Sequence, residues 1–265
     1  MARGDRQNDD DDFMDPPQRN GATGRRKEDD EKKKRIRNRA SQERLTALTD
    51  KFSDDQKGAA AEMGMQSMMA VRCTNLVNPV CDWLGEIYDP ASREFMIPGR
   101  GRLPLNEESV FCTLGVPRGH IKVPYEAMTT HGDVFKMKLL MYLISAVFAP
   151  TTSLRPSNKC FPIPAKLKDV KNMNWCKFIA DFLHDAFASK VYQKGCRLHL
   201  MLMYVDCLDL STVDFTGTGG PPPTHKFAVS AWTINAVKAV LAADRLMAKH
   251  SIDYSVFGGP QNFEK

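Results

Sequence analysis

The sequence has no cysteines in a CxxC arrangement and no HxxxH or HExxH motif. Its seven cysteines are an odd number scattered along the chain, which argues against a secreted disulfide framework and favours a reducing compartment. Cys196 with His199, and His184 beside Asp181 and Asp185, come nearest to a metal-ligand spacing. Each set supplies too few ligands for a zinc site. We therefore expect neither a metal ion nor a cofactor.

Long hydrophobic runs are also missing. The longest apolar stretch, residues 137–149, is interrupted by Lys138 and is too short to cross a bilayer. No apolar run follows Met1, so we expect no secretory signal peptide. These absences predict a protein that is neither secreted nor bound to a membrane.

No complete catalytic motif is present. The glycine-rich run at Gly217 is followed by prolines and lacks the Lys-Ser/Thr of a phosphate-binding loop. Asp206-Cys207 is similar to the Asp-Cys-Gly nucleophile of proteases that act on ubiquitin-like modifiers. Here Leu208 follows in place of glycine, and a cysteine in an apolar run has a raised pKa and is a poor nucleophile. We expect no catalytic residue and no enzymatic activity.

Charge is concentrated at the amino-terminal end. Residues 25–44 contain ten basic and five acidic residues, an excess of +5 that equals the formal net charge of the whole chain. Residues 1–40 have few aliphatic or aromatic side chains and cannot bury enough surface to offset their ordering entropy. We predict a disordered charged tail over residues 1–40, followed by a folded domain over residues 41–265.

The basic cluster Lys32, Lys33, Lys34 and Arg35 is typical of segments bound by nuclear import receptors. The alternative is an ordinary solvated charge run. Residues 35–44 also partly resemble the basic region of leucine-zipper factors, but Thr46 replaces an arginine of that family and no leucine heptads follow. The tail therefore predicts a nuclear protein, with a cytoplasmic one as the alternative.

The most ordered local pattern covers residues 93–119. Two apolar runs, residues 95–97 and 103–105, flank a Pro-Gly-Arg-Gly turn, which predicts a β-hairpin. Asn106 then provides a helix N-cap, and Gly115 a left-handed helix end. Phe111 is expected to face the core with Val110 and Leu114.

Helical periodicity and capping residues predict most other elements. We expect further helices at residues 41–52, 54–61, 78–89, 133–149, 175–191, 196–210 and 230–248, and an edge strand at 120–125. Leu198, Leu200 and Leu202 also alternate as in a strand, so a strand is the alternative for residues 196–210. Ser53 with Gln56 forms a capping box, Asn78 is the expected cap of the third helix, and residues 63–69 fill the core with methionine. The fold class is mainly α (α+β), with about seven or eight helices and one short hairpin.

Four motifs in this order support a family resemblance. REFMIPGRGRLPLNEESVFCTLGVPRG, LMYLISAVFAPTT, NMNWCKFIADFLHDA and LMLMYVDCLDL resemble transposon-associated proteins of grass genomes that are related to the plant mobile domain, often labelled "aminotransferase-like". The resemblance covers about residues 63–248. It implies a helical plant-mobile-domain-like domain, and no Schiff-base lysine supports the aminotransferase label.

The resemblance implies a non-enzymatic, transposon-derived nuclear interaction domain with protein partners. Weak contact with DNA or chromatin through the basic tail would fit this function. Around the hairpin, Arg100, Arg102 and Arg118 are candidate phosphate contacts, with a solubilising role as the alternative. The competing reading is the N-terminal fragment of a mobile-element protein whose cysteine protease domain is absent from this chain.

Overall fold

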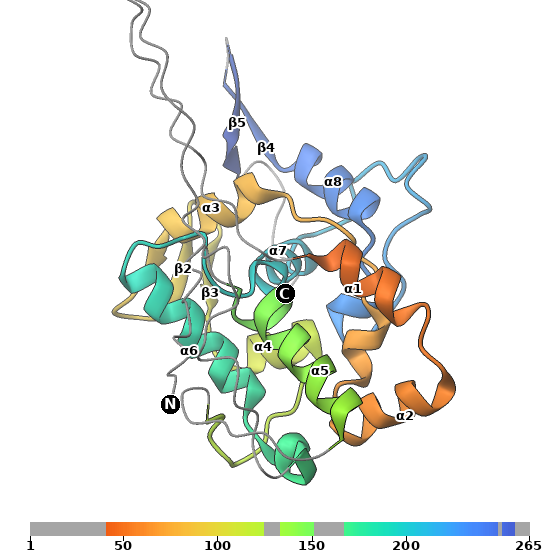
Figure 1. The fold of residues 1–265 in the computed structure, drawn as a ribbon. Coiled ribbons are helices and arrows are strands. Elements are labelled where there is room, and N and C mark those ends of the chain that lie inside the picture. Colours follow the sequence, from red (N-terminus) through yellow and green to blue (C-terminus); the bar gives the residue numbers. More distant parts are fainter. Residues whose placement is uncertain (1–40, 125–132, 151–166, 249–250, 258–265) are drawn as a thin grey trace, which may run out of the picture. The chain divides into compact units, whose positions relative to one another are not determined.

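A computed structural model describes residues 41–124, 133–150, 167–248 and 251–257 (Figure 1). The predicted tail at residues 1–40, and the proline-bearing connection at residues 151–166, lie outside the described residues. The described part is mainly helical with a small antiparallel sheet, which confirms the predicted fold class. In this part of the chain, no helix is both long and apolar enough to span a membrane.

The helices and strands follow one another along the chain as the sequence predicts in most places. The α-helices are α1 (Gln42–Thr49), α2 (Asp54–Glu62), α3 (Asn78–Glu86), α4 (Glu107–Leu114), α5 (Val134–Leu143), α6 (Trp175–Ala188), α7 (Arg197–Asp206) and α8 (Ile234–Ala243). Shorter helical segments are η1 (Gln66–Ala70), the π-helical η2 (Ile144–Phe148), η4 (Leu167–Asn172) and η5 (Ala228–Ser230). The strands are β1 (Tyr88–Asp89), β2 (Glu94–Ile97), β3 (Gly101–Pro104), β4 (Arg245–Ala248) and β5 (Ser251–Phe257).

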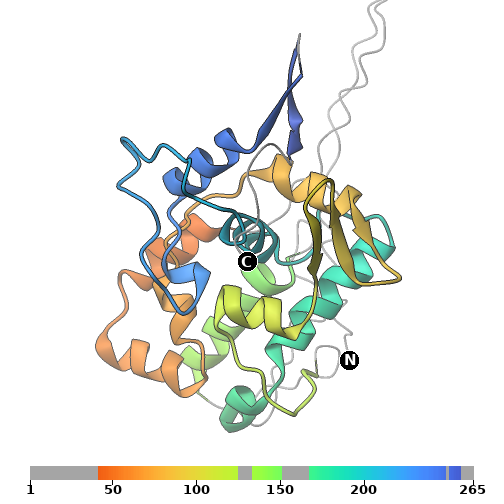
Figure 2. The ribbon, with the colours of Figure 1, turned by 180° about the vertical axis from the view of Figure 1, so that it is seen from behind.

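Helix α7 lies at the centre of the described elements, and α3, α4, α8 and η5 pack against it (Figures 1 and 2). Every residue from Arg197 to Val205 is buried. A helix without a polar face has no side to present to water, so it is stable only when neighbours surround it. The apolar helix α5, continued by η2, is likewise buried along Leu139–Ala149 except at Met141, Tyr142 and Ser145.

The predicted hairpin is present as β2 and β3, which pair antiparallel with Phe95 opposite Leu103. Phe95 and Leu103 point into the core, while the alternate residues Met96 and Arg102 are exposed, as expected for a strand with one buried face. The sequence did not predict β1, a two-residue strand that pairs with β2 through Tyr88 opposite Phe95. The sheet therefore has three strands.

The hairpin leads directly into α4, whose two ends are as predicted. The Asn106 side chain accepts a hydrogen bond from the Ser109 backbone N–H at 2.9 Å, and the Ser109 hydroxyl closes a capping box. Gly115 ends the helix with φ of 65°, and a Cβ there would lie 2.6 Å from the Phe227 ring. Any other residue would meet both a strained backbone and a ring already in place.

Four expected details are corrected or refined by the structure. Phe111 packs against the core as expected but is only half-buried, because its ring also lies under the Arg118 guanidinium and against Phe227. Val77, and not Asn78, is the N-cap of α3, since the helix starts one residue earlier. In place of the strand expected at 120–125, the described residues 120–124 contribute one isolated bridge, Ile121 with Met173.

The fourth correction concerns the last predicted helix, residues 230–248. Thr233 caps α8 by accepting a hydrogen bond from the Ala236 N–H at 3.2 Å, so the helix starts later than expected. The helix ends at Ala243, and the chain continues as β4, which pairs with β5. The prediction extended the helix to residue 248 because the segment is rich in alanine. Pairing with β5 makes Arg245–Ala248 a strand instead.

A buried ion pair ties the hairpin turn to the end of α8. The Arg100 guanidinium lies 2.5 Å from one Asp244 carboxylate oxygen, and the Tyr204 hydroxyl donates to the other at 2.5 Å. The side chains of Arg100 and Asp244 are 6% and 0% exposed. Burial, followed by the charge of Asp244, raises the pKa of Tyr204, so its hydroxyl remains a donor.

The hairpin provides a matched test of this ion pair. Arg100→Ala should lower the free energy of unfolding by about 3–5 kcal/mol, because it leaves Asp244 as an uncompensated buried charge. Arg102, on β3, pairs with Glu94 at 3.3 Å but is 60% exposed. Arg102→Ala should therefore cost about 1 kcal/mol or less. Urea denaturation followed by tryptophan fluorescence measures both, and equal losses would contradict the buried pair.

Candidate functional site

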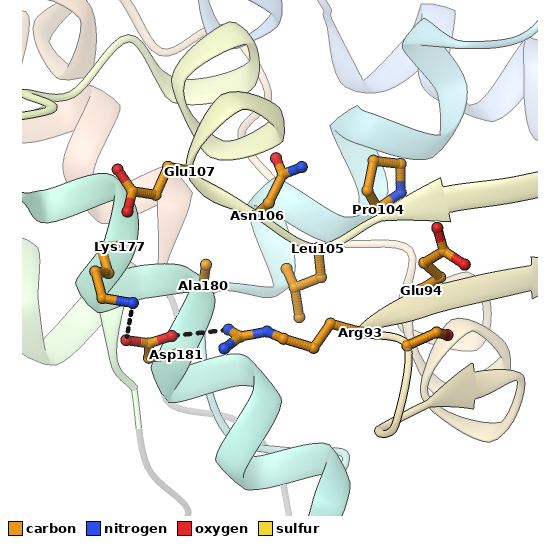
Figure 3. Close-up of a pocket in the computed structure, with 10 residues that line it drawn as sticks. Arg93, Glu94, Pro104, Leu105, Asn106, Glu107, Lys177, Ala180 and Asp181 are labelled. Atoms are coloured by element: carbon orange, nitrogen blue, oxygen red, sulfur yellow. Dashed lines mark hydrogen bonds and ion pairs between the residues drawn. The ribbon is translucent and has the colours of Figure 1, made fainter.

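A groove of about 440 Å³ lies between the β2–β3 hairpin, the start of α4 and the first half of α6 (Figure 3). Its volume falls within the range of small-ligand sites, about 300–1,000 Å³. The lining residues are Ser92, Arg93, Glu94, Pro104, Leu105, Asn106, Glu107, Lys177, Ala180 and Asp181. Leu105 and Ala180 are buried, so they form an apolar floor between charged walls.

One wall carries two cations that share a single carboxylate. The Arg93 guanidinium lies 2.8 Å from one oxygen of Asp181, and the Lys177 ammonium lies 3.2 Å from the other (Figure 3). Burial would raise the pKa of Asp181, but the hydrogen bonds from Arg93 and Lys177 outweigh it and hold that pKa below its ordinary value. Asp181 therefore stays ionised, and the three side chains together carry a formal charge of +1.

The second wall carries Glu107, in the first turn of α4. In Figure 3, Lys177 lies between Glu107 and Asp181. The Glu107 carboxylate accepts a hydrogen bond from the Asn174 side-chain amide at 2.8 Å. The side-chain oxygen Oδ1 of Asn174 in turn caps α6 by accepting a hydrogen bond from the Lys177 backbone N–H at 2.8 Å. One amide thus fixes the starts of two helices relative to each other. Within the described residues, Glu107 has no cation at ion-pair distance, so this wall carries a formal charge of −1.

The fifth charged residue of the lining, Glu94, is neutralised by Arg102, which does not line the groove. The groove therefore has one cationic wall and one anionic wall, and no net charge.

Arg93 stands at a turn with φ of 59°, which is unusual for a residue other than glycine. Its backbone oxygen accepts from the Leu105 N–H at 2.9 Å, which holds this turn against the start of α4.

Beside the groove, the Tyr88 hydroxyl and His184 Nδ1 are 2.8 Å apart. Burial raises the pKa of Tyr88 to about 12, and the neighbouring Arg93 offsets this only in part. The hydroxyl is therefore a hydrogen-bond donor at neutral pH and a poor general base. His184 was one of the weak metal-ligand candidates in the sequence. In the structure it contacts the hydroxyl of Tyr88, whose ring packs against Phe95 and Phe187.

The three arginines predicted as phosphate contacts are placed apart. Arg100 is buried against Asp244, which removes it from any surface contact. Arg102 pairs with Glu94 outside the groove, and Arg118 pairs with Glu108 and covers the Phe111 ring. Arg102 and Arg118 are accessible and stay candidates, whereas the basic cluster Lys32, Lys33, Lys34 and Arg35 lies outside the described residues.

Of the described cysteines, Cys73, Cys81, Cys176 and Cys196 are buried, Cys207 is half-buried and Cys112 is exposed. Burial raises the pKa of Cys207 to about 11 and that of Cys176 to about 12, so neither is a thiolate at neutral pH. Across the described ranges, no three His, Cys, Asp or Glu side chains lie close enough to hold a metal ion. Cys196 and His199, the pair that came nearest in the sequence, are both fully buried on α7 or at its start.

A family model described as Domain of unknown function (DUF8566) matches residues 38–131 and 126–201. These segments together cover more than half of the chain. The chain belongs to the DUF8566 family. No curated protein and no solved structure matches it.

Every residue that lines the groove lies within the DUF8566 match, as do the hairpin and α4 to α6. Asp244, which fixes the hairpin turn, lies beyond it, with α8 and the β4–β5 pair. The sequence contained the Lys177–Asp181 spacing that makes an i,i+4 pair on a helix. Nothing in it indicated that Arg93, 88 residues away, reaches the same carboxylate.

His199 gives the domain a pH dependence that can be measured. Neither ring nitrogen has a hydrogen-bond partner among the described residues, and burial lowers the pKa of His199 to about 3. An unfolded histidine titrates near pH 6.5. The unfolded state therefore binds one more proton than the folded state between these values, and stability falls as the pH drops from 6.5 towards 3.

His199→Leu should remove this proton uptake. The wild-type free energy of unfolding should fall by up to about 1.4 kcal/mol more per pH unit than that of the variant. Urea melts at several values between pH 4.5 and 6.5 would measure both slopes, in a range above most carboxylate titrations. Parallel slopes for the two proteins would mean that His199 is protonated in the folded state.

Proposed function

We propose that this chain is a non-enzymatic, transposon-derived nuclear interaction domain that binds a polypeptide partner in the groove between the hairpin and α6. The observation that carries the proposal is the make-up of the groove. Most of its lining residues are polar or charged, and they include side chains of both signs around a small apolar floor. Such a surface can pair with charged side chains of a polypeptide. The raised pKa values of Cys176, Cys207 and Tyr88 support binding rather than catalysis.

The nuclear part of the proposal rests on the amino-terminal charge pattern. The cluster Lys32–Arg35 supplies four consecutive cations, the chemistry that import receptors recognise. The same cations suit weak contact with nucleic acid through phosphates. In this proposal the tail sets the compartment and the groove selects the partner.

Replacing Lys32, Lys33, Lys34 and Arg35 by alanine should move a fluorescent fusion from the nucleus to the cytoplasm, because the import receptor loses its cationic contacts. The fusion must exceed the passive limit of the nuclear pore. A matched variant that changes the three lysines to arginine keeps the charge and should stay nuclear. Nuclear accumulation of the alanine variant would contradict the role given to this cluster.

The binding part is tested by selecting a displayed random peptide library on the full chain. A family of related peptides should be enriched, and Lys177→Glu should weaken their binding at least about tenfold by reversing a charge in the groove wall. Lys171→Glu is the matched control, since Lys171 is exposed on η4 and does not line the groove. No enrichment, or equal binding to both variants, would contradict a polypeptide site in the groove.

A further inference from the structure

The two walls of the groove differ in charge, and the difference specifies the ligand. The Arg93–Asp181–Lys177 group carries +1 and is 37–57% exposed at its three side chains. Asp181 uses one oxygen for each cation, and the Lys177 side chain is 57% exposed, so its ammonium retains further N–H donors for a ligand. A carboxylate that enters beside Lys177 meets both a point charge and unused donors.

The Glu107 wall offers the opposite chemistry. One carboxylate oxygen accepts from Asn174, and the other has no hydrogen-bond partner among the described residues. An ammonium or guanidinium group of a ligand would pair with this free oxygen. In Figure 3, Glu107 lies on one side of Ala180 and the Arg93–Asp181 pair on the other.

We infer that the groove binds a dipolar polypeptide segment, one acidic and one basic side chain separated by a small apolar residue that rests on Leu105 and Ala180. The inference rests on the proposed polypeptide-binding function and adds the charge pattern of the partner. A ligand with one sign of charge would leave one wall unpaired and would place its own charge near the like-charged wall. Such a mismatch disfavours the wrong partner more than it strengthens the right one.

The walls are also set in advance. Asn174, the N-cap of α6, donates a hydrogen bond to Glu107. Asp181, also on α6, pairs with both Arg93 and Lys177. These contacts restrict the side chains before a ligand binds, which lowers the conformational entropy lost on binding. The groove therefore offers a ligand both signs of charge on side chains that already have partners in the protein.

The test uses capped heptapeptides with neutral ends. The first contains Asp-Ala-Lys at its centre and the second the reverse order, Lys-Ala-Asp, because the structure allows either direction. Asn replaces Asp in a third peptide, and Gln replaces Lys in a fourth. Titrations followed by the backbone amide signals of Lys177 and Ala180 would measure binding to the full chain. At least one dipolar peptide should bind about tenfold more tightly than either singly charged one.

Two variants assign the walls. Glu107→Gln should abolish the advantage of a lysine-bearing peptide and leave the preference for the acidic side chain. Glu108→Gln is its matched control on the same helix, since Glu108 points away from the groove to Arg118. Lys177→Gln should have the converse effect on the acidic preference, with Lys171→Gln as its control.

The failure of this inference can be told apart from that of the proposed function. Equal binding of the dipolar and the singly charged peptides, or no binding of any heptapeptide, would overturn the dipolar ligand. Library peptides that bind the groove but carry one sign of charge would do the same, and would leave the polypeptide site in place. If Glu108→Gln, like Glu107→Gln, no longer bound the lysine-bearing peptide preferentially, the role given to Glu107 would be contradicted.

Discussion

The carboxylate of Asp244 is a fully buried charge that connects the hairpin turn, α7 and the end of α8. It accepts from Arg100 in the hairpin turn and from Tyr204 on the central helix α7, both at 2.5 Å. A buried carboxylate is stable only when its partners stay in place. The hairpin turn, α7 and the end of α8 are therefore fixed relative to one another, although they lie up to 144 residues apart.

The groove depends on this arrangement. One side of it is the strand-to-helix passage from Pro104 to Glu107, which continues β3, and the other is α6. If the hairpin moved as a flap, Arg93 could not hold its 2.8 Å contact with Asp181. A second buried cation, Arg197, supports the same frame by pairing with Asp82 at 2.8 Å and so linking α3 to α7. The charged walls are then set by the core and not by solvent-exposed loops.

Local signals in the sequence were sufficient for the hairpin, for the Asn106 cap and for the left-handed Gly115, because each depends on residues within one turn. They were insufficient wherever partners are distant in the chain. Arg100 stands in a Pro-Gly-Arg-Gly turn, where an arginine is expected to be exposed. Only the fold shows that it is buried in an ion pair with Asp244. The extension of the last helix past Ala243 failed for a related reason, since pairing between β4 and β5 overrides alanine propensity. The groove could not be predicted, because Arg93 and Asp181 meet only in the folded chain.

Native-state hydrogen exchange at the Leu105 amide tests the central claim, that the hairpin and α4 belong to the core frame. This N–H donates to the Arg93 backbone oxygen at 2.9 Å, beside the groove. If the buried ion pair fixes the hairpin, the amide exchanges only when the whole domain unfolds, with an opening free energy equal to the global value. An opening free energy well below the global one, insensitive to denaturant, would show a flap that opens by itself and would contradict a preformed groove.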